Sequence, residues 1–170
     1  MSDLMDELWA AGERAGALLK ERGEKIAVVE SSAGGLISAA LLRVPGASGY
    51  YEGGAVIYTR TSIREVAGLD MKKLWKEQGI RSSSEPFAKL LSERIRETHE
   101  TVWGLGETGA AGPGNGYGDP AGHSCQAVSG PNPIVTTLRT GKEDRGENMV
   151  RFAINALNLL SGQLEQPATA

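Results

Sequence analysis

Short β-type runs alternate with helical stripes along the whole 170-residue chain. The apolar spacing of residues 3–22 fits a helix, and the run that follows ends on Glu30. This alternation predicts an α/β fold, and we expect a single three-layer α/β/α domain around one central sheet. The other expected strands are 50–58, 102–105 (weakly), 124–129 and 134–140, and the other expected helices are 36–44, 61–69, 71–78, 85–98 and 144–160.

The chain has the length of one ordinary domain, and no internal repeat or shift of composition marks a second one. We therefore expect one domain over residues 1–162, including an N-terminal helix. Residues 163–170 (QLEQPATA) are expected to form a frayed tail.

Charge and cysteine content exclude several classes of function. The 18 basic and 21 acidic residues give a net charge of −3, so there is no basic field to attract nucleic acid. No apolar run approaches the ~18 residues of a membrane span, and the acidic N-terminus lacks the basic start of a secretion signal. Cys125 is the single cysteine, which excludes an intrachain disulfide and a cysteine-based zinc site. We expect a cytoplasmic protein without metal, membrane or nucleic-acid partners.

The stretch Glu30 to Gly35 (ESSAGG) joins an expected strand to an expected helix. Free backbone N–H groups at a helix start form an anion site, and a nearby serine hydroxyl would lie beside possible oxyanion donors. The alternative is a helix cap and a simple turn. Two known motifs are excluded. A P-loop needs Gly-Lys-Ser/Thr, but Gly141-Lys142 is followed by Glu143, and the G-x-S-x-G nucleophile elbow does not occur.

Two further segments are candidates for ligand contact. We expect a long glycine-rich loop over residues 104–122, in which Thr108 offers a hydroxyl and Gly109 to Gly114 offer bare backbone. The alternative is a mobile surface loop. Asp144 fits the cap of the last helix, and Arg145 after it could bind a phosphate or remain solvated. Tyr58, at the end of an apolar strand, could face a pocket or the core.

Three strings carry a family resemblance: VVESSAGGLISAALLRVPGASGYYEGGAVIY, ETGAAGPGNG, and the Asp-Arg pair before the last helix. Together they resemble the CinA C-terminal domain family over about residues 5–160, and the chain looks like the free-standing form of that domain. The family includes nicotinamide mononucleotide deamidases. The resemblance therefore implies an amidohydrolase that converts nicotinamide mononucleotide to nicotinic acid mononucleotide and ammonia.

The resemblance also implies roles for individual residues. Ser31 is the implied nucleophile, and the N–H groups of residues 33–35 would hold the oxyanion. Arg145 and the segment 109–114 would bind the phosphate, with no metal or organic cofactor, and the family suggests a homo-oligomer. The implied catalytic residues are Ser31 and Tyr58, and the implied substrate-binding residues are Glu30, Ala33, Gly34, Gly35, Thr108, Gly109, Gly112 and Arg145.

The chain departs from the family pattern at three places. Ser32 and Ala33 stand where the family commonly has Cys and Thr, and Ile63 stands where it often has a lysine that could activate the nucleophile. Arg60 or Arg64 could replace the charge, but arginine does not deprotonate and cannot act as a base. Two alternatives stay open: a non-catalytic mononucleotide-binding domain that has lost this lysine, and a hydrolase for a different amide or mononucleotide.

Overall fold

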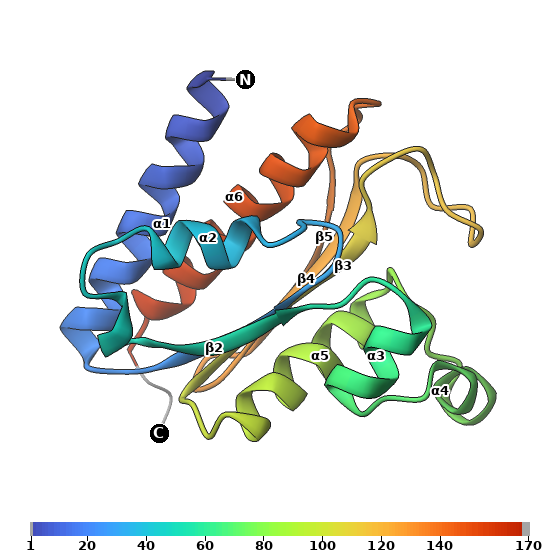
Figure 1. Ribbon diagram of the computed structural model, residues 1–170, viewed down its shortest axis with the longest axis horizontal. Coiled ribbons are helices and arrows are strands. Elements are labelled where there is room, and N and C mark those ends of the chain that lie inside the picture. Colours follow the sequence, from blue (N-terminus) through green and yellow to red (C-terminus); the bar gives the residue numbers. More distant parts are fainter. Residues whose placement is uncertain (1, 168–170) are drawn as a thin grey trace.

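The computed structural model describes residues 2–167 and shows one five-stranded sheet between two layers of helices (Figure 1). This confirms the predicted three-layer α/β/α architecture. In chain order the elements are α1 Ser2–Arg22, β1 Ile26–Glu30, α2 Leu36–Leu42, the short 3₁₀ helix Ala47–Gly49, β2 Tyr51–Val56, α3 Arg60–Ala67, α4 Met71–Gln78, α5 Glu85–Thr98, β3 Trp103–Ala110, β4 His123–Ser129, β5 Ile134–Arg139 and α6 Arg145–Leu164.

The sheet has the strand order β2-β1-β3-β4-β5. β1 pairs in parallel with β2 on one side and β3 on the other, whereas β3–β4 and β4–β5 are antiparallel. Because β2, β1 and β3 run in the same direction, their carboxyl ends meet at one edge of the sheet. Ligands of open α/β sheets bind outside this edge, so the loops after β1, β2 and β3 form the expected place for a site.

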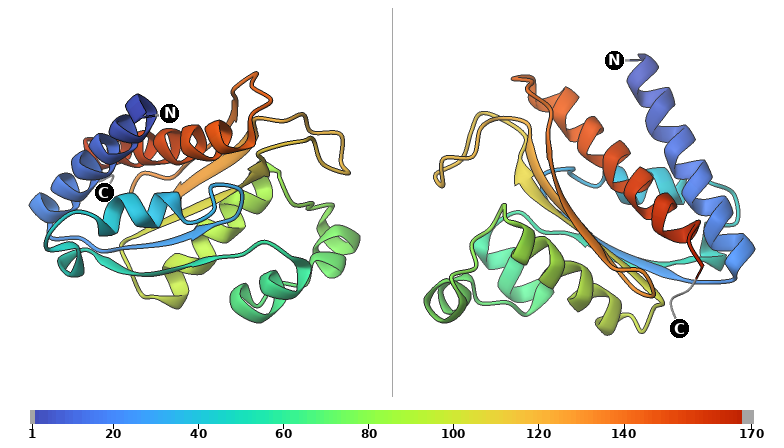
Figure 2. Two further views of the ribbon diagram at one scale, coloured as in Figure 1. Left: turned by 45° about the horizontal axis from the view of Figure 1, so that its top comes forward. Right: turned by 180° about the vertical axis from the view of Figure 1, so that it is seen from behind.

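Helices α1, α2 and α6 cover one face of the sheet, and α3, α4 and α5 lie on the other (Figure 2). Successive side chains of a strand point to opposite faces. In the fully buried β1, Val28 accordingly joins the core cluster under α1 and α6, while Val29 joins the cluster under α3 and α5. The sheet thus separates two apolar cores, and the uninterrupted apolar run of β1 reflects burial on both sides.

The last helix begins as predicted and ends later than predicted. Asp144 is its N-cap, and the carboxylate accepts the backbone N–H three residues further on at 2.6 Å. The helix continues past the expected end at Leu160 to Leu164, and both Gln163 and Leu164 are buried. Of the expected tail, residues 168–170 lie outside the described residues. Within residues 2–167, no helix is both long and apolar enough to cross a membrane.

The prediction of a continuous loop over residues 104–122 is wrong, because β3 extends from Trp103 to Ala110. Gly104 and Gly106 lie on the face of β3 against which α5 packs. A Cβ atom at Gly106 would be 2.5 Å from the carbonyl oxygen of Ala88, and one at Gly104 would meet the α5 backbone even more closely. These glycines therefore allow close packing of a helix on a central strand rather than forming a loop.

We expect Gly106→Ala to destabilise the protein by about 1–3 kcal/mol, because the added methyl group must displace α5 from β3. Urea denaturation would measure the change in the free energy of unfolding. Gly116→Ala is the matched control, since a Cβ atom there has no neighbour within 4 Å. Equal stability of the two variants would contradict the proposed close packing.

Candidate functional site

The turn after β1 lies at the carboxyl edge of the sheet. Gly34 and Gly35 adopt φ values of 68° and 98°, a left-handed conformation that favours glycine, and they redirect the chain into α2. Ser31, the first residue of the turn, is partly buried. Its Oγ forms no hydrogen bond with any residue in the described part of the chain. The predicted nucleophile is therefore held at the strand end with its hydroxyl uncommitted.

The buried carboxylate of Glu30 closes the start of α2. It accepts hydrogen bonds from the N–H groups of Gly35 (2.9 Å), Ile37 (3.1 Å) and Ser38 (2.9 Å). These amides lie at the start of the helix, where the backbone N–H groups have no acceptor within the helix itself. Glu30, implied by the resemblance as a substrate contact, thus acts on the protein's own backbone.

A second buried carboxylate, Glu107 of β3, fixes the turn from the other side. Its Oε2 accepts the N–H groups of Ser31 (3.0 Å) and Ala33 (2.9 Å). Its Oε1 accepts the hydroxyls of Ser32 and Ser124. Burial raises the pKa of Glu107, although these hydrogen bonds act in the opposite direction. No role for Glu107 follows from the sequence, where it is one acidic residue within a glycine-rich string.

These contacts change the assignment of the oxyanion donors. The N–H groups of Ala33 and Gly35 are donated to the two carboxylates, and that of Gly34 is donated to the carbonyl oxygen of Ser31 at 3.1 Å. The expectation that residues 33–35 offer free donors is therefore wrong. Within the turn as the structure describes it, Ser32 is the residue whose backbone N–H has no partner.

The structure brings together three residues that the sequence singled out separately. The guanidinium of Arg145, at the start of α6, donates to the Tyr58 hydroxyl at 2.9 Å and to the carbonyl oxygen of Gly112. Tyr58 follows β2 and is 64% exposed, so this contact lies at the surface. The serine turn adjoins the same end of α6, because a Cβ atom at Gly34 would lie 2.5 Å from the methyl carbon of Met149.

Thr108 lies apart from this cluster. It is buried, and its Oγ1 accepts the backbone N–H of Ser83 at 3.1 Å. It therefore faces the α5 side of β3, opposite to Glu107. Gly109 lies on the face of β3 next to the serine turn, because a Cβ atom added there would be 2.8 Å from the Oγ of Ser32. Gly109 thus leaves room for the Ser32–Glu107 hydrogen bond.

The position of the family's lysine is apolar in this chain. The Ile63 side chain is 7% exposed and packs in the second core cluster with Val29 and Ile57. Of the two arginines that could replace the charge, Arg64 forms an exposed ion pair with Glu65 at 2.7 Å.

Cys125 and His123 lie close together without forming a reactive pair. The Sγ and Nε2 atoms are 3.5 Å apart, but Nε2 donates to the carbonyl oxygen of Ser83 at 2.9 Å. Both side chains are buried, and burial raises the pKa of the Cys125 thiol. The sulfur is therefore kept as a thiol, the weakly nucleophilic form. Among residues 2–167, no group of three or more His, Cys, Asp or Glu side chains is arranged to hold a metal ion.

The fold and the site define a class: a small α/β/α domain with a serine turn at the carboxyl edge of its parallel strands and an Arg–Tyr pair at the same edge. The chain belongs to the CinA C-terminal domain family, whose model matches residues 10–164. It is 37% identical over 145 residues to a CinA-like protein of Anaeromyxobacter sp. (strain K) and 38% identical over 147 residues to one of Acidobacterium capsulatum.

These matches cover 85% and 86% of this chain but 35% of each relative, so the chain spans about a third of the length of those curated proteins. Solved structures agree with the fold. A CinA superfamily protein from Klebsiella pneumoniae superposes with a TM-score of 0.83 at 23% identity, covering 92% of this chain and 97% of that one. The competence/damage inducible protein CihA from Agrobacterium tumefaciens gives 0.80 at 26% identity, covering 94% and 96%.

Proposed function

We propose that this chain is an amidohydrolase that converts nicotinamide mononucleotide to nicotinic acid mononucleotide and ammonia, with Ser31 as nucleophile. The observation that carries the proposal is the convergence at one sheet edge of an uncommitted Ser31 hydroxyl and the Tyr58–Arg145 pair. Membership of the CinA C-terminal domain family supports the proposal, because the resemblance to that family implies this activity.

In the proposed reaction, Ser31 Oγ attacks the carboxamide carbon, and the backbone N–H of Ser32 stabilises the oxyanion. The tetrahedral intermediate collapses, the C–N bond breaks, and the nitrogen leaves as ammonia after taking up a proton. Water then hydrolyses the acyl ester and restores the Ser31 hydroxyl. Tyr58 is the candidate acceptor of the serine proton, because its hydroxyl lies at the same sheet edge and is held in place by the Arg145 guanidinium at 2.9 Å.

The phosphate of the substrate needs a cationic partner. Arg145 carries five N–H donors in a planar fork, which suits bidentate binding of a phosphate. Its contacts with Tyr58 and the Gly112 carbonyl fix the guanidinium at the edge of the site, where further donors remain for the ligand.

A second candidate is a mononucleotide-binding domain without catalytic activity. It is favoured by one observation, the apolar and buried Ile63 at the position where the family often has lysine. Such a domain would retain the serine turn and Arg145 for binding but could not activate the Ser31 hydroxyl.

Ammonia release from nicotinamide mononucleotide separates these candidates, with thermal-shift titration of the same nucleotide as the measure of binding. Turnover by the wild-type protein that is lost in Ser31→Ala would support the amidohydrolase. Binding without turnover would select the binding domain. If the protein neither binds nor hydrolyses the nucleotide, both candidate functions are contradicted.

We expect Arg145→Ala to weaken binding of nicotinamide mononucleotide by about 10- to 150-fold, because a charge-assisted contact contributes about 1.5–3 kcal/mol. Arg145 is exposed, so the melting temperature should stay unchanged. Calorimetric titration measures the dissociation constant. Arg14→Ala, which removes an exposed arginine on α1, is the control. An unchanged dissociation constant for Arg145→Ala would remove this residue from the site.

A further inference from the structure

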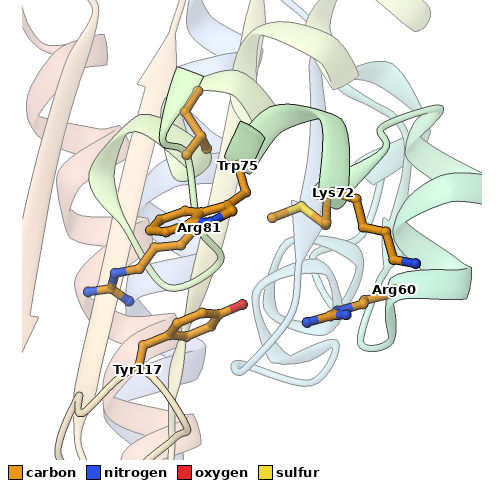
Figure 3. Close-up of a pocket in the computed structure, with 7 residues that line it drawn as sticks. Arg60, Lys72, Trp75, Arg81 and Tyr117 are labelled. Atoms are coloured by element: carbon orange, nitrogen blue, oxygen red, sulfur yellow. The ribbon is translucent and has the colours of Figure 1, made fainter. Parts of the chain in front are cut away.

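A cavity of about 310 Å³ lies outside the serine turn, between the starts of α3 and α4 and the turn 115–119 (Figure 3). Among its lining residues, only Arg60 is also a candidate to replace the lysine charge at the serine site. Its volume is at the lower end of the roughly 300–1,000 Å³ typical of small-molecule sites. The lining residues are Arg60, Met71, Lys72, Trp75, Ile80, Arg81 and Tyr117.

Two exposed aromatic rings form one side of this cavity. Trp75 is 61% exposed and Tyr117 is 47% exposed, although burial of such rings is usually favourable. Figure 3 shows the hydroxyl of Tyr117 turned toward the side on which Arg60 and Lys72 lie. The exposed surfaces of the two rings are therefore available to a flat ligand.

Tyr117 is held in place by a polar network. The Asp119 carboxylate accepts hydrogen bonds from both terminal guanidinium nitrogens of Arg81, at 2.6 and 2.9 Å. It also accepts one from the side-chain amide of Asn115, at 2.9 Å. The Oδ1 of Asn115 accepts the backbone N–H of Tyr117 at 3.0 Å, and the Arg81 guanidinium lies 5.2 Å from the centre of the Tyr117 ring. The aromatic wall is thus built by contacts within the protein.

The opposite side carries two cations without a direct ion pair, although the Asp70 carboxylate at the N-cap of α4 attracts Lys72 electrostatically. The charge of Arg81 is balanced by Asp119, but neither Arg60 nor Lys72 forms an ion pair among the described residues. The nearby carboxylate of Asp70 accepts backbone N–H groups at the start of α4. Arg60 and Lys72 also lie in the first turns of α3 and α4, which contain no acidic residue. Cations are unfavourable at helix N-termini, so a bound anion would relieve this arrangement.

We propose that this cavity binds a phosphorylated aromatic compound of the nucleotide class. The ring stacks against Trp75 and Tyr117, and the phosphate lies between Arg60 and Lys72. Stacking of a base on an aromatic side chain is tolerant of base identity, so the site selects for a flat ring joined to an anion rather than for one base. The site goes beyond the proposed amide hydrolysis and does not depend on Ser31.

Adenosine monophosphate is the probe, titrated into the full chain by calorimetry. Adenosine, which lacks the phosphate, and ribose 5-phosphate, which lacks the ring, should each bind at least about tenfold more weakly. Trp75→Leu, Tyr117→Leu and the double variant Arg60→Gln with Lys72→Gln should each weaken binding of adenosine monophosphate about tenfold or more. The substituted side chains are largely exposed, and unchanged melting temperatures would show that the variants fold.

Two controls separate this site from the serine turn. Lys76→Gln removes an exposed cation of α4 that does not line the cavity, and Ser31→Ala removes the proposed nucleophile; both should leave the dissociation constant unchanged. The proposal is overturned if adenosine monophosphate does not bind, or if Trp75→Leu and Tyr117→Leu bind it as the wild type does. It is also overturned if Lys76→Gln weakens binding as much as the double variant. Failure of amide hydrolysis leaves these results unaffected.

Discussion

Replacing Ser31 with alanine should lower the rate of ammonia release from nicotinamide mononucleotide by roughly 10³-fold or more, since removal of a serine nucleophile can cost about 10⁶-fold in kcat. Its Oγ has no hydrogen bond to lose within the described chain, so stability should hardly change. The turn keeps its geometry, because Ser31 contacts Glu107 through the backbone N–H. Steady-state ammonia release and urea denaturation measure the two effects.

Ser32→Ala is the matched control in the same turn. The Ser32 hydroxyl is buried and donated to Glu107, so it is committed to structure. Its removal should cost about 1 kcal/mol of stability and change the rate far less than Ser31→Ala. An inactive Ser32→Ala beside an active Ser31→Ala would show that Ser32 is the nucleophile and would contradict the assignment made here.

Glu107→Ala should destabilise the protein by about 2–4 kcal/mol, because it leaves buried donors without acceptors. The backbone N–H groups of Ser31 and Ala33 lose their partner, together with the hydroxyls of Ser32 and Ser124. Urea denaturation measures this loss. Glu107→Gln is the matched variant, since its amide oxygen can accept the two N–H groups and its NH₂ can donate to the hydroxyls. It should retain most of the stability.

The same pair of variants tests the protonation of Glu107. Burial raises the pKa of its carboxyl above the ordinary 4.5, so the native state binds the proton more tightly than the unfolded state. The contribution to stability is then full below pH 4.5 and is lost as the pH rises through the higher native pKa. Glutamine has no proton to lose. The stability of Glu107→Gln relative to wild type should therefore increase with pH, and a pH-independent difference would contradict a raised pKa.

Local features of the fold follow from the sequence because their causes lie within a few residues. The apolar spacing of α1, the start of α5 at Glu85 and the Asp144 cap are of this kind. The end of α6 is different, because Leu164 remains helical through burial in the core rather than through a local signal. The glycines of β3 also mislead local reasoning, since their partner α5 is fixed only by tertiary packing.

The candidate site divides in the same way. The serine turn and Arg145 follow from motifs, but the contact of Arg145 with Tyr58 joins residues that are 87 positions apart. Glu107 is likewise 76 positions from Ser31, and nothing in either segment indicates that one will bind the other. The cavity beside Trp75 requires α4 to meet the turn at Tyr117, which is a property of the assembled fold.

The two carboxylates that hold the turn after β1 have a consequence for divergence among related domains. With its amides anchored to Glu30 and Glu107, the turn cannot reshape itself around a new ligand. Among residues 2–167, no hydrogen bond joins this turn to the wall formed by α4 and residues 115–119. Surface side chains of that wall can therefore be exchanged without altering the backbone of the turn.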